Sequence, residues 1–493
     1  MTGDLLLRSV RVAGPGRELL PTGEPIDILI RGGAIADIAP AGNLRVAVES
    51  LDGEGAWVIP GLWDHHVHTV QWALDAQRIA LGAANGAGEA ARMVADAAPL
   101  ADGRIVGSGF RDGLWRDRPS RAALDAVTGE RPAYLISADV HGVWLNTAAL
   151  RREGFDGVDD DGILREDDAF EISRRLNAAD DATADAAVRA AATRAAARGV
   201  TGIVDFDMAW NAQAWQRRAA AGFDAHRVEF AFYREGLERA IGEGLRTGEV
   251  LEGTGGLVRV GPLKLITDGS LGTRTAACSH SYAHDPDNFG VLTISPDEVR
   301  ELLMRATASG IEVAVHAIGD RAVASALDAF TYTQARGTLE HAQLVRHADL
   351  ARFARLGVAA SVQPTHAVDD RDLADELWRE QQAIGYPMAT LAAAGIPLRF
   401  GSDAPVAPLD PWMTIAAAVH RTGDEREPWQ PQERVGIDTA LRSSSRHGEA
   451  TVELGAVADL ALCGADPRTA DRQTLSTMPV LATILGGRIT HRA

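Results

Sequence analysis

Short apolar runs alternate with longer amphipathic stretches through the middle of the chain. Eight such runs end in a polar residue or a glycine, and intervening segments such as 182–198, 296–309 and 321–334 are rich in Ala, Leu and Arg. Strands that alternate with helices predict parallel β/α units, and eight units predict an α/β fold of the (β/α)8 TIM barrel type. The predicted barrel strands are 57–60, 202–205, 228–232, 263–266, 313–316, 338–341, 358–362 and 398–403.

The two ends of the chain show a different pattern, with short apolar or alternating runs separated by Gly and Pro. We therefore expect a small β-sandwich domain built from both termini, residues 1–57 and 436–493, around a barrel over 58–435. The gap between the first and second predicted barrel strands is too long for one helix and its loops. It predicts an inserted subdomain at about 75–180, placed over the barrel mouth.

Composition narrows the function classes. The 493 residues include 49 Lys+Arg and 68 Asp+Glu, a net charge of −19, which argues against a nucleic-acid groove because phosphate binding needs a basic surface. The sequence has no apolar run of membrane-spanning length and no signal-peptide pattern at its start, so we expect a cytoplasmic protein that contacts no membrane. Two cysteines cannot form a disulfide framework.

Histidines and one aspartate stand at the ends of the predicted strands. His66 and His68 share a face of extended chain, whereas His65 points the other way and is expected to be structural. A His-x-His pair alone is a weak signal, but His316, His341 and Asp403 close three further strands. In a barrel these ends meet at the active-site face, so the pattern predicts a site for divalent metal ions.

The chain has a single lysine, Lys264, among 48 arginines, and it lies in the fourth predicted strand. A lone lysine indicates chemistry that a guanidinium cannot perform. An ammonium has no lone pair for a metal ion, but carboxylation by CO2 would turn Lys264 into a carbamate whose two oxygens can bridge two ions. A Schiff-base lyase is the alternative that this lysine leaves open.

Several motifs resemble those of the amidohydrolase superfamily, within it the amidohydrolase family 3 branch, called YtcJ-like, which includes N-substituted formamide deformylases. The resemblance covers nearly the whole chain and does not specify the substrate. The motifs are Val58–His68, Asp139–Asn146, Lys264–Ala276, Val315–Asp320, Glu340–Gln343, Ser361–His366 and Gly401–Pro405.

The resemblance implies a role for each of these residues. His66 and His68 would bind the more buried metal, His316 and His341 the second, and a carboxylated Lys264 would bridge them. Asp403 would contact the first metal and act as general acid and base. The expected substrate contacts lie in or near the motifs and are His141, Trp144, Trp115, Arg274 and Gln363.

These residues together predict a hydrolase of carbon–nitrogen bonds other than peptide bonds, acting on a small amide such as an N-acyl or N-formyl amine. A metal-activated hydroxide would attack the carbonyl, and Asp403 would move the proton to the leaving nitrogen. Zinc is the first choice for a His and carboxylate set. The alternatives are a mononuclear hydrolase or deaminase on the same barrel, or a non-catalytic binding barrel. The residues leave the oligomeric state open, although the resemblance implies that a homodimer is common in the family.

Overall fold

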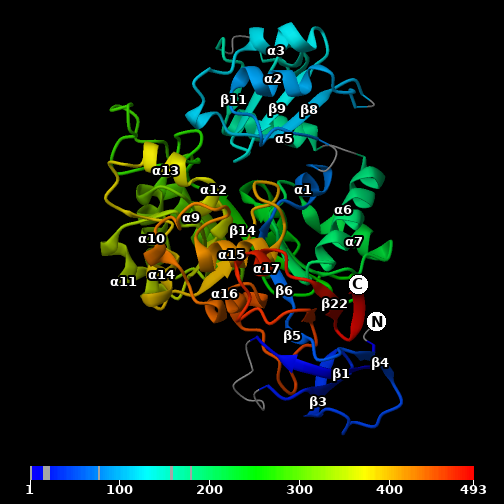
Figure 1. Cartoon of the computed structure of the whole chain (residues 1–493). Coiled ribbons are helices and arrows are strands. Elements are labelled where there is room, and N and C mark those ends of the chain that lie inside the picture. Colours follow the sequence, from blue (N-terminus) through cyan, green and yellow to red (C-terminus); the bar gives the residue numbers. More distant parts are fainter. Residues whose placement is uncertain (1–2, 15–22, 76–77, 101, 156–158, 178–179) are drawn as a thin grey trace.

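Eight parallel strands form a nearly closed barrel at the centre of the molecule (Figure 1). The computed structural model describes residues 3–14, 23–75, 78–100, 102–155, 159–177 and 180–493. The last strand returns to the first through a bridge between Val67 and Ala404, and the arrangement confirms the predicted (β/α)8 barrel. The barrel strands are β6 Leu62–Val67, β12 Val200–Asp205, β13 Arg227–Tyr233, β14 Val258–Ile266, β15 Val313–Ala317, β16 Gly337–His341, β18 Ala359–Val362 and β20 Leu398–Phe400.

Helices cover the outside of the barrel and pack their apolar faces on it. Helix α9 (Pro296–Ala308) illustrates the local signals, because Ser295 caps it by accepting from the Glu298 N–H and Pro296 occupies its first turn. The other helices of this part are α1 Thr69–Asp75, α6 Asp181–Ala196, α7 Asn211–Ala220, α8 Leu237–Gly242, α10 Asp320–Thr333, α11 His347–Leu356, α12 Pro364–Asp369, α13 Arg371–Leu377, α14 Met388–Ala393, α15 Pro411–His420, α16 Ile437–Ser443 and α17 Arg472–Ser476. A short pair, β17 Leu344–Val345 and β19 Ile384–Gly385, lies outside the barrel sheet.

Strands from both ends of the chain share a second eight-stranded sheet, below the barrel in Figure 1. The order is β23-β22-β21-β5-β1-β2-β3, with β4 beside β1. The prediction that 57–60 begins the barrel is wrong: β5 (Trp57–Pro60) pairs with β1 and β21 in this sheet, and the barrel begins at Leu62. The remaining strands are β1 Leu5–Val12, β2 Ile26–Arg31, β3 Ala34–Pro40, β4 Glu49–Asp52, β21 Leu460–Cys463, β22 Val480–Leu485 and β23 Arg488–Arg492.

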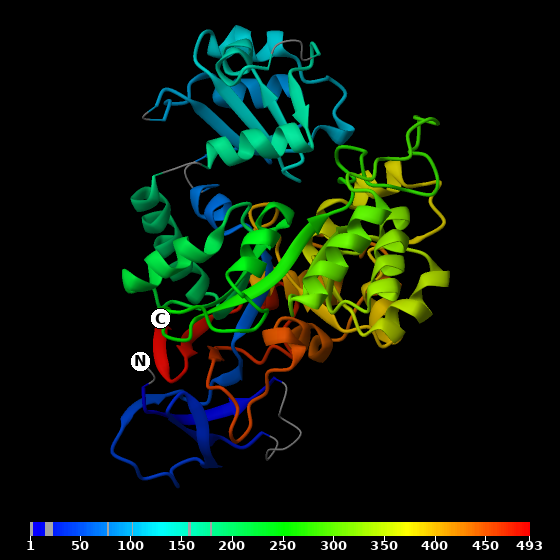
Figure 2. The same ribbon diagram turned by 180° about the vertical axis from the view of Figure 1, so that it is seen from behind.

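A third sheet lies over the barrel mouth and comes from the chain between the first two barrel strands (Figure 2). Its order is β11-β10-β9-β8-β7, from β7 Ile79–Ala80, β8 Ile105–Phe110, β9 Ala133–Ser137, β10 Gly142–Leu145 and β11 Ile163–Arg165. Its helices are α2 Ala87–Ala95, α3 Arg121–Thr128, α4 Thr147–Glu153 and α5 Asp167–Leu176. Helix α5 lies on the side that faces the barrel, so inserted residues reach the ends of the barrel strands. Among the described residues, no helix is long and apolar enough to cross a membrane.

Candidate metal centre

The six predicted ligands meet at the carboxyl ends of the barrel strands. Lys264 Nζ lies 3.3 Å from His66 Nε2, and Asp403 Oδ1 lies 3.5 Å from His66 Nε2 and 3.3 Å from His68 Nε2. The His341 ring is 4.9 Å from the His66 ring and 4.5 Å from that of His316, between centroids. The six residues come from the ends of five barrel strands, β6, β14, β15, β16 and β20, so the barrel itself assembles the cluster.

The donor set suits divalent metal ions. All six residues are buried, and His66, His341 and Asp403 each offer one ligand atom, with the three atoms within 4.8 Å of one another. His316 Nε2 is buried and has no hydrogen-bond partner among the described residues, although Asp268 Oδ1 lies 3.4 Å away. Imidazole and carboxylate donors in a buried site with an unpartnered nitrogen fit metal binding.

Neighbouring groups fix which nitrogen each imidazole turns to the centre. His66 Nδ1 donates to Glu340 Oε2 at 2.7 Å, which leaves Nε2 facing Lys264 and Asp403. His341 Nδ1 donates to Gln363 Oε1 at 2.8 Å. The other ring nitrogen of His341, Nε2, takes no part in this hydrogen bond. Such partners set the tautomer and ring orientation of a metal-binding histidine.

Burial and charge control the protonation of the cluster. Burial lowers the pKa of His66 well below its ordinary value, and the Lys264 charge lowers it further. Burial also lowers the pKa of Lys264, to about 8, although Glu340 and Asp403 oppose this effect. For Asp403, burial alone would raise the pKa, but His66 and His68 outweigh it and hold the pKa well below its usual range. Burial lowers the pKa of His316 and His341 as well, so these two imidazoles and that of His66 favour the neutral form while Asp403 favours the ionised form, the forms that bind metal ions.

Two of the predicted ligands have a strained backbone conformation. His341 has a φ of 72° and Asp403 a φ of 59°, in the left-handed region that side chains other than glycine avoid. The Asp403 N–H donates to the His66 carbonyl at 2.8 Å, and the Val406 N–H donates to the Asp403 carbonyl at 2.8 Å. Hydrogen bonds from both sides therefore hold Asp403 in a conformation that costs about 1 kcal/mol or more.

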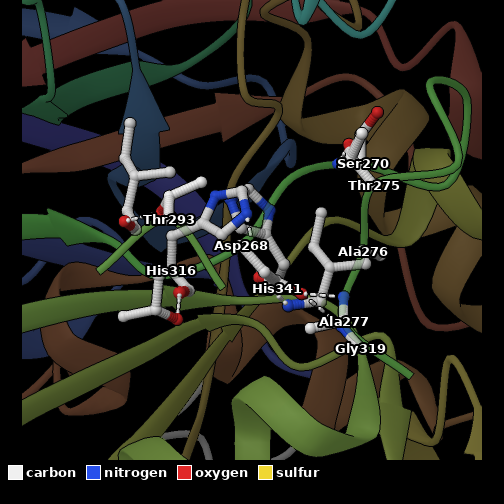
Figure 3. Close-up of polar contacts among 12 residues, drawn as sticks. Asp268, Ser270, Thr275, Ala276, Ala277, Thr293, His316, Gly319 and His341 are labelled. Carbon is white, nitrogen blue, oxygen red and sulfur yellow. Dashed lines mark hydrogen bonds and ion pairs between the residues drawn. The ribbon is translucent and has the colours of Figure 1, made fainter. Parts of the chain in front are cut away.

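Asp268 organises the loop beside His316. Figure 3 shows it between His316 and the backbone of the loop that follows β14. Its carboxylate accepts from the N–H groups of Ile318, Gly319 and Ala277 at 3.0, 2.8 and 2.9 Å. It thus joins the ends of β14 and β15 and stands next to a predicted ligand.

A cavity of about 430 Å³ opens from the cluster toward the inserted sheet, and we call it the mouth cavity. His316, His341 and Asp403 line it on the barrel side, and His141 and Trp115 line it on the inserted side. The His141 ring is 5.7 Å from the His316 ring, and its Nδ1 lies 2.9 Å from Glu166 Oε2. Burial would lower the pKa of His141, but the Glu166 charge and hydrogen bond raise it to about 9.

Three predicted substrate contacts lie elsewhere. Trp144 is fully buried in the inserted sheet, where its indole N–H donates to the Ser120 carbonyl, so it is a packing residue. Gln363 is buried and hydrogen-bonded to His341, so it orients the imidazole of that predicted ligand. Arg274 lines a separate cavity of about 230 Å³ next to the mouth cavity. His65 is structural as expected, because its Nδ1 lies 2.9 Å from the Phe400 carbonyl.

Sequence reasoning missed Glu340 and Asp268, which contact the predicted ligands His66 and His316, and Glu166, which contacts the predicted substrate contact His141. Glu340 directly precedes His341, and Asp268 lies four residues after Lys264. Both therefore lie inside the motifs that contain these two predicted ligands. His366, whose Nε2 lies 4.0 Å from Asp403 Oδ2, also joins the cluster.

Comparison with known proteins identifies the family. The family model described as "Amidohydrolase family" matches residues 49–491, which is most of the chain. The chain belongs to the amidohydrolase family. This amidohydrolase is 26% identical to the putative amidohydrolase YtcJ of Bacillus subtilis, over 90% of each chain. It is also 26% identical to the N-substituted formamide deformylase of Arthrobacter pascens, over 94% of each.

Solved structures agree with the fold of this amidohydrolase. An uncharacterised metal-dependent hydrolase from Pyrococcus furiosus superimposes with a TM-score of 0.75 at 27% identity, over 94% of this chain and 100% of that chain. A second, from Pyrococcus horikoshii, gives 0.79 at 24% identity, over 95% and 99%. The solved structures cover nearly the whole chain, so they share the barrel, the sheet built from both ends of the chain and the inserted sheet. The chain is a member of a hydrolase family.

Proposed function

We propose that this amidohydrolase is a metal-dependent hydrolase that cleaves the carbon–nitrogen bond of a small amide, with N-formyl and N-acyl amines as the substrate class. The observation that carries the proposal is the buried cluster of His66, His68, Lys264, His316, His341 and Asp403 beside the mouth cavity. The formamide deformylase among its relatives supports an amide substrate, and the uncharacterised metal-dependent hydrolase supports a hydrolysis that depends on a metal ion.

The donors divide into two sets. His66, His68 and Asp403 would hold one ion, and His316 and His341 a second, with zinc as the first choice for these donors. Divalent ions in these sites would lower the pKa of water toward neutrality and polarise the carbonyl of an amide. Lys264 would join the sets as a carbamate: its amine adds to CO2, forms a C–N bond and releases one proton.

Asp403 is the residue for proton transfer. Its carboxylate lies within 3.5 Å of His66 and within 3.3 Å of His68 and also lines the mouth cavity. In that position it would accept a proton from the attacking water and return it to the leaving nitrogen, which yields a carboxylic acid and an amine. His141, held by Glu166 on the opposite wall, would contact the substrate.

Metal content tests the proposal directly. The wild-type protein and the Lys264→Arg variant are both produced in medium that contains bicarbonate, and the metal content of each is measured. Arginine keeps the positive charge but cannot form a carbamate. We expect two ions per chain, a fall to one or none in the variant, and hydrolysis of formamides or N-acyl amines by the wild type alone. Because Lys264 is the only lysine, a labelled lysine carbamate formed from ¹³C-bicarbonate must disappear in the variant.

A mononuclear hydrolase or deaminase is the second candidate, and the three-donor set of His66, His341 and Asp403 favours it. One ion in both proteins would support this candidate. No metal in either protein after reconstitution would contradict both.

A further inference from the structure

A second cavity, of about 650 Å³, reaches the metal centre from another side, and we call it the side cavity. Lys264, Leu265 and Ile266 at the end of β14 form part of its lining. Helix α5 of the inserted sheet contributes Asp167, Phe170 and Arg174, which share one helix face. Because Lys264 Nζ lies 3.3 Å from His66 Nε2, a molecule in this cavity approaches the same centre as one in the mouth cavity.

The side cavity has a wall suited to an aromatic or aliphatic group. Trp210 and Phe232 pack with their ring centroids 5.8 Å apart, and Met208 and Ile294 extend the apolar lining. Phe170 stands edge-on to the His141 ring at 5.0 Å, so it lies between the two cavities. This wall would remove an apolar substrate group from water, which favours binding.

The lining of the side cavity has more arginines than carboxylates, whereas the lining of the mouth cavity has more carboxylates than arginines. The side cavity is lined by Arg174, Arg234 and Arg239 against Asp167 and Glu235. Arg239 stacks on the Trp210 ring at 4.3 Å, and its Nε donates to Glu243, which leaves its terminal nitrogens as donors. The mouth cavity is lined by Asp112, Asp139, Asp369, Asp370, Asp372 and Asp403 against Arg111.

We propose that the side cavity binds the apolar half of the substrate and that this half ends in a carboxylate. The apolar wall would hold an aromatic ring and Arg239 would bind the anion at the rim, while the amide lies at the metal centre. This inference rests on the proposed function, and it names the substrate class: amides with an aromatic group that carries an acid at its far end. The acidic mouth cavity would reject that anion by like-charge repulsion.

Three matched formamides test the proposal: N-benzylformamide, the same compound with a para carboxylate, and the same compound with a para aminomethyl group. Binding is measured by calorimetry and hydrolysis is measured separately, with the metal-loaded enzyme. We expect the carboxylate compound to bind about tenfold more tightly than N-benzylformamide and the aminomethyl compound to bind most weakly.

Variants of the two cavities separate the possible outcomes. Trp210→Ala should weaken all three compounds about tenfold, and Arg239→Gln should remove only the preference for the carboxylate. Trp115→Ala, in the mouth cavity, is the matched aromatic control and should keep that preference. Equal binding of the three compounds, no binding at all, or loss of the preference in Trp115→Ala alone would overturn the inference. Binding with the expected pattern but without hydrolysis would support the inference and contradict the proposed function.

Discussion

Glu340 Oε2 lies 2.7 Å from Nδ1 of His66, and both side chains are buried. The other carboxylate oxygen of Glu340 accepts from the Thr338 hydroxyl, so the glutamate is held from both sides. This contact assigns the proton of His66 to Nδ1 and turns Nε2 toward Lys264 and Asp403. The orientation of one predicted ligand therefore depends on the residue that precedes another, His341, in the chain.

Replacement of Glu340 should weaken metal binding. Glu340→Leu leaves His66 Nδ1 without an acceptor and frees the ring to rotate, and loss of such a partner costs about 10–100-fold in metal affinity. Glu340→Gln, which can still accept a hydrogen bond, should lose less. Chelator competition measures the affinity. Glu229→Gln is the control. Glu229 is a partly buried glutamate of the same barrel, and the structure pairs it with His447 and Arg446 rather than with a predicted ligand.

Gln363 should support metal binding by orienting His341, as Glu340 orients His66. Its amide oxygen accepts from His341 Nδ1 at 2.8 Å, so Gln363→Leu should lower the occupancy of the ion held by His341 while the site at His66 keeps its metal. Gln363→Glu retains an acceptor and should preserve occupancy. Metal analysis of protein loaded at limiting concentration distinguishes the two variants. Equal occupancy in the leucine variant and the wild type would show that His341 needs no such partner.

The sequence predicted which side chains would meet at the candidate metal centre, whereas the residues that hold those side chains in place were not predicted. Three of these side chains lie on strands that the apolar runs of the sequence indicate, namely Lys264, His316 and His341. In a (β/α)8 barrel the carboxyl ends of the strands meet at one face, so these side chains were expected to lie together. Glu340 meets His66 across 274 positions, and Gln363 meets His341 from a neighbouring strand end. Such pairings depend on strand register and side-chain direction, which hydrophobic periodicity does not encode.

Two errors in the prediction have the same kind of cause. The run 57–60 is apolar in the way that a barrel strand is, but it pairs with strands from both termini, and the barrel begins two residues later. Trp144 lies in a motif with His141, yet it is on β10 and faces the core of the inserted sheet. In both cases a neighbour distant in sequence decides where the segment packs.

Stability should fall in mild acid because of His226. This residue is fully buried beside Phe223, and neither ring nitrogen has a hydrogen-bond partner among the described residues. Burial lowers its pKa to about 3, whereas in the unfolded chain it is near 6.5. Below about pH 6.5 the unfolded state binds a proton that the folded state does not. This contribution to stability is therefore present above that pH and is lost as the pH falls toward 3.

Chemical denaturation at several pH values measures this effect. Between pH 6 and 4 the free energy of unfolding of the wild type should decline more steeply than that of His226→Leu, by up to about 1.4 kcal/mol per pH unit. Above pH 7 the two curves should run parallel, which serves as the internal control. Parallel curves over the whole range would show that His226 is protonated equally in both states.

Gly202 should be essential for the position of the first barrel strand. It pairs with Trp63, which is buried, and a Cβ at Gly202 would lie 2.0 Å from Trp63 Cε2. Trp63 stands three residues before His66 on β6. Gly202→Ala must therefore displace a large ring in a packed core, which costs about 1–3 kcal/mol or more and should also lower metal content.

A double-mutant cycle makes this prediction specific. Trp63→Phe shortens the ring that meets the new methyl group, so Gly202→Ala should cost less in that background than in the wild type. Gly242→Ala is the control, because nothing lies within 4 Å of a Cβ there at the end of α8, and alanine favours the helix. Additive costs in the cycle would mean that Gly202 acts through its backbone. A smaller cost in the Trp63→Phe background would mean that contact with Trp63 requires the glycine and that β6 carries His66 in a position set by this packing.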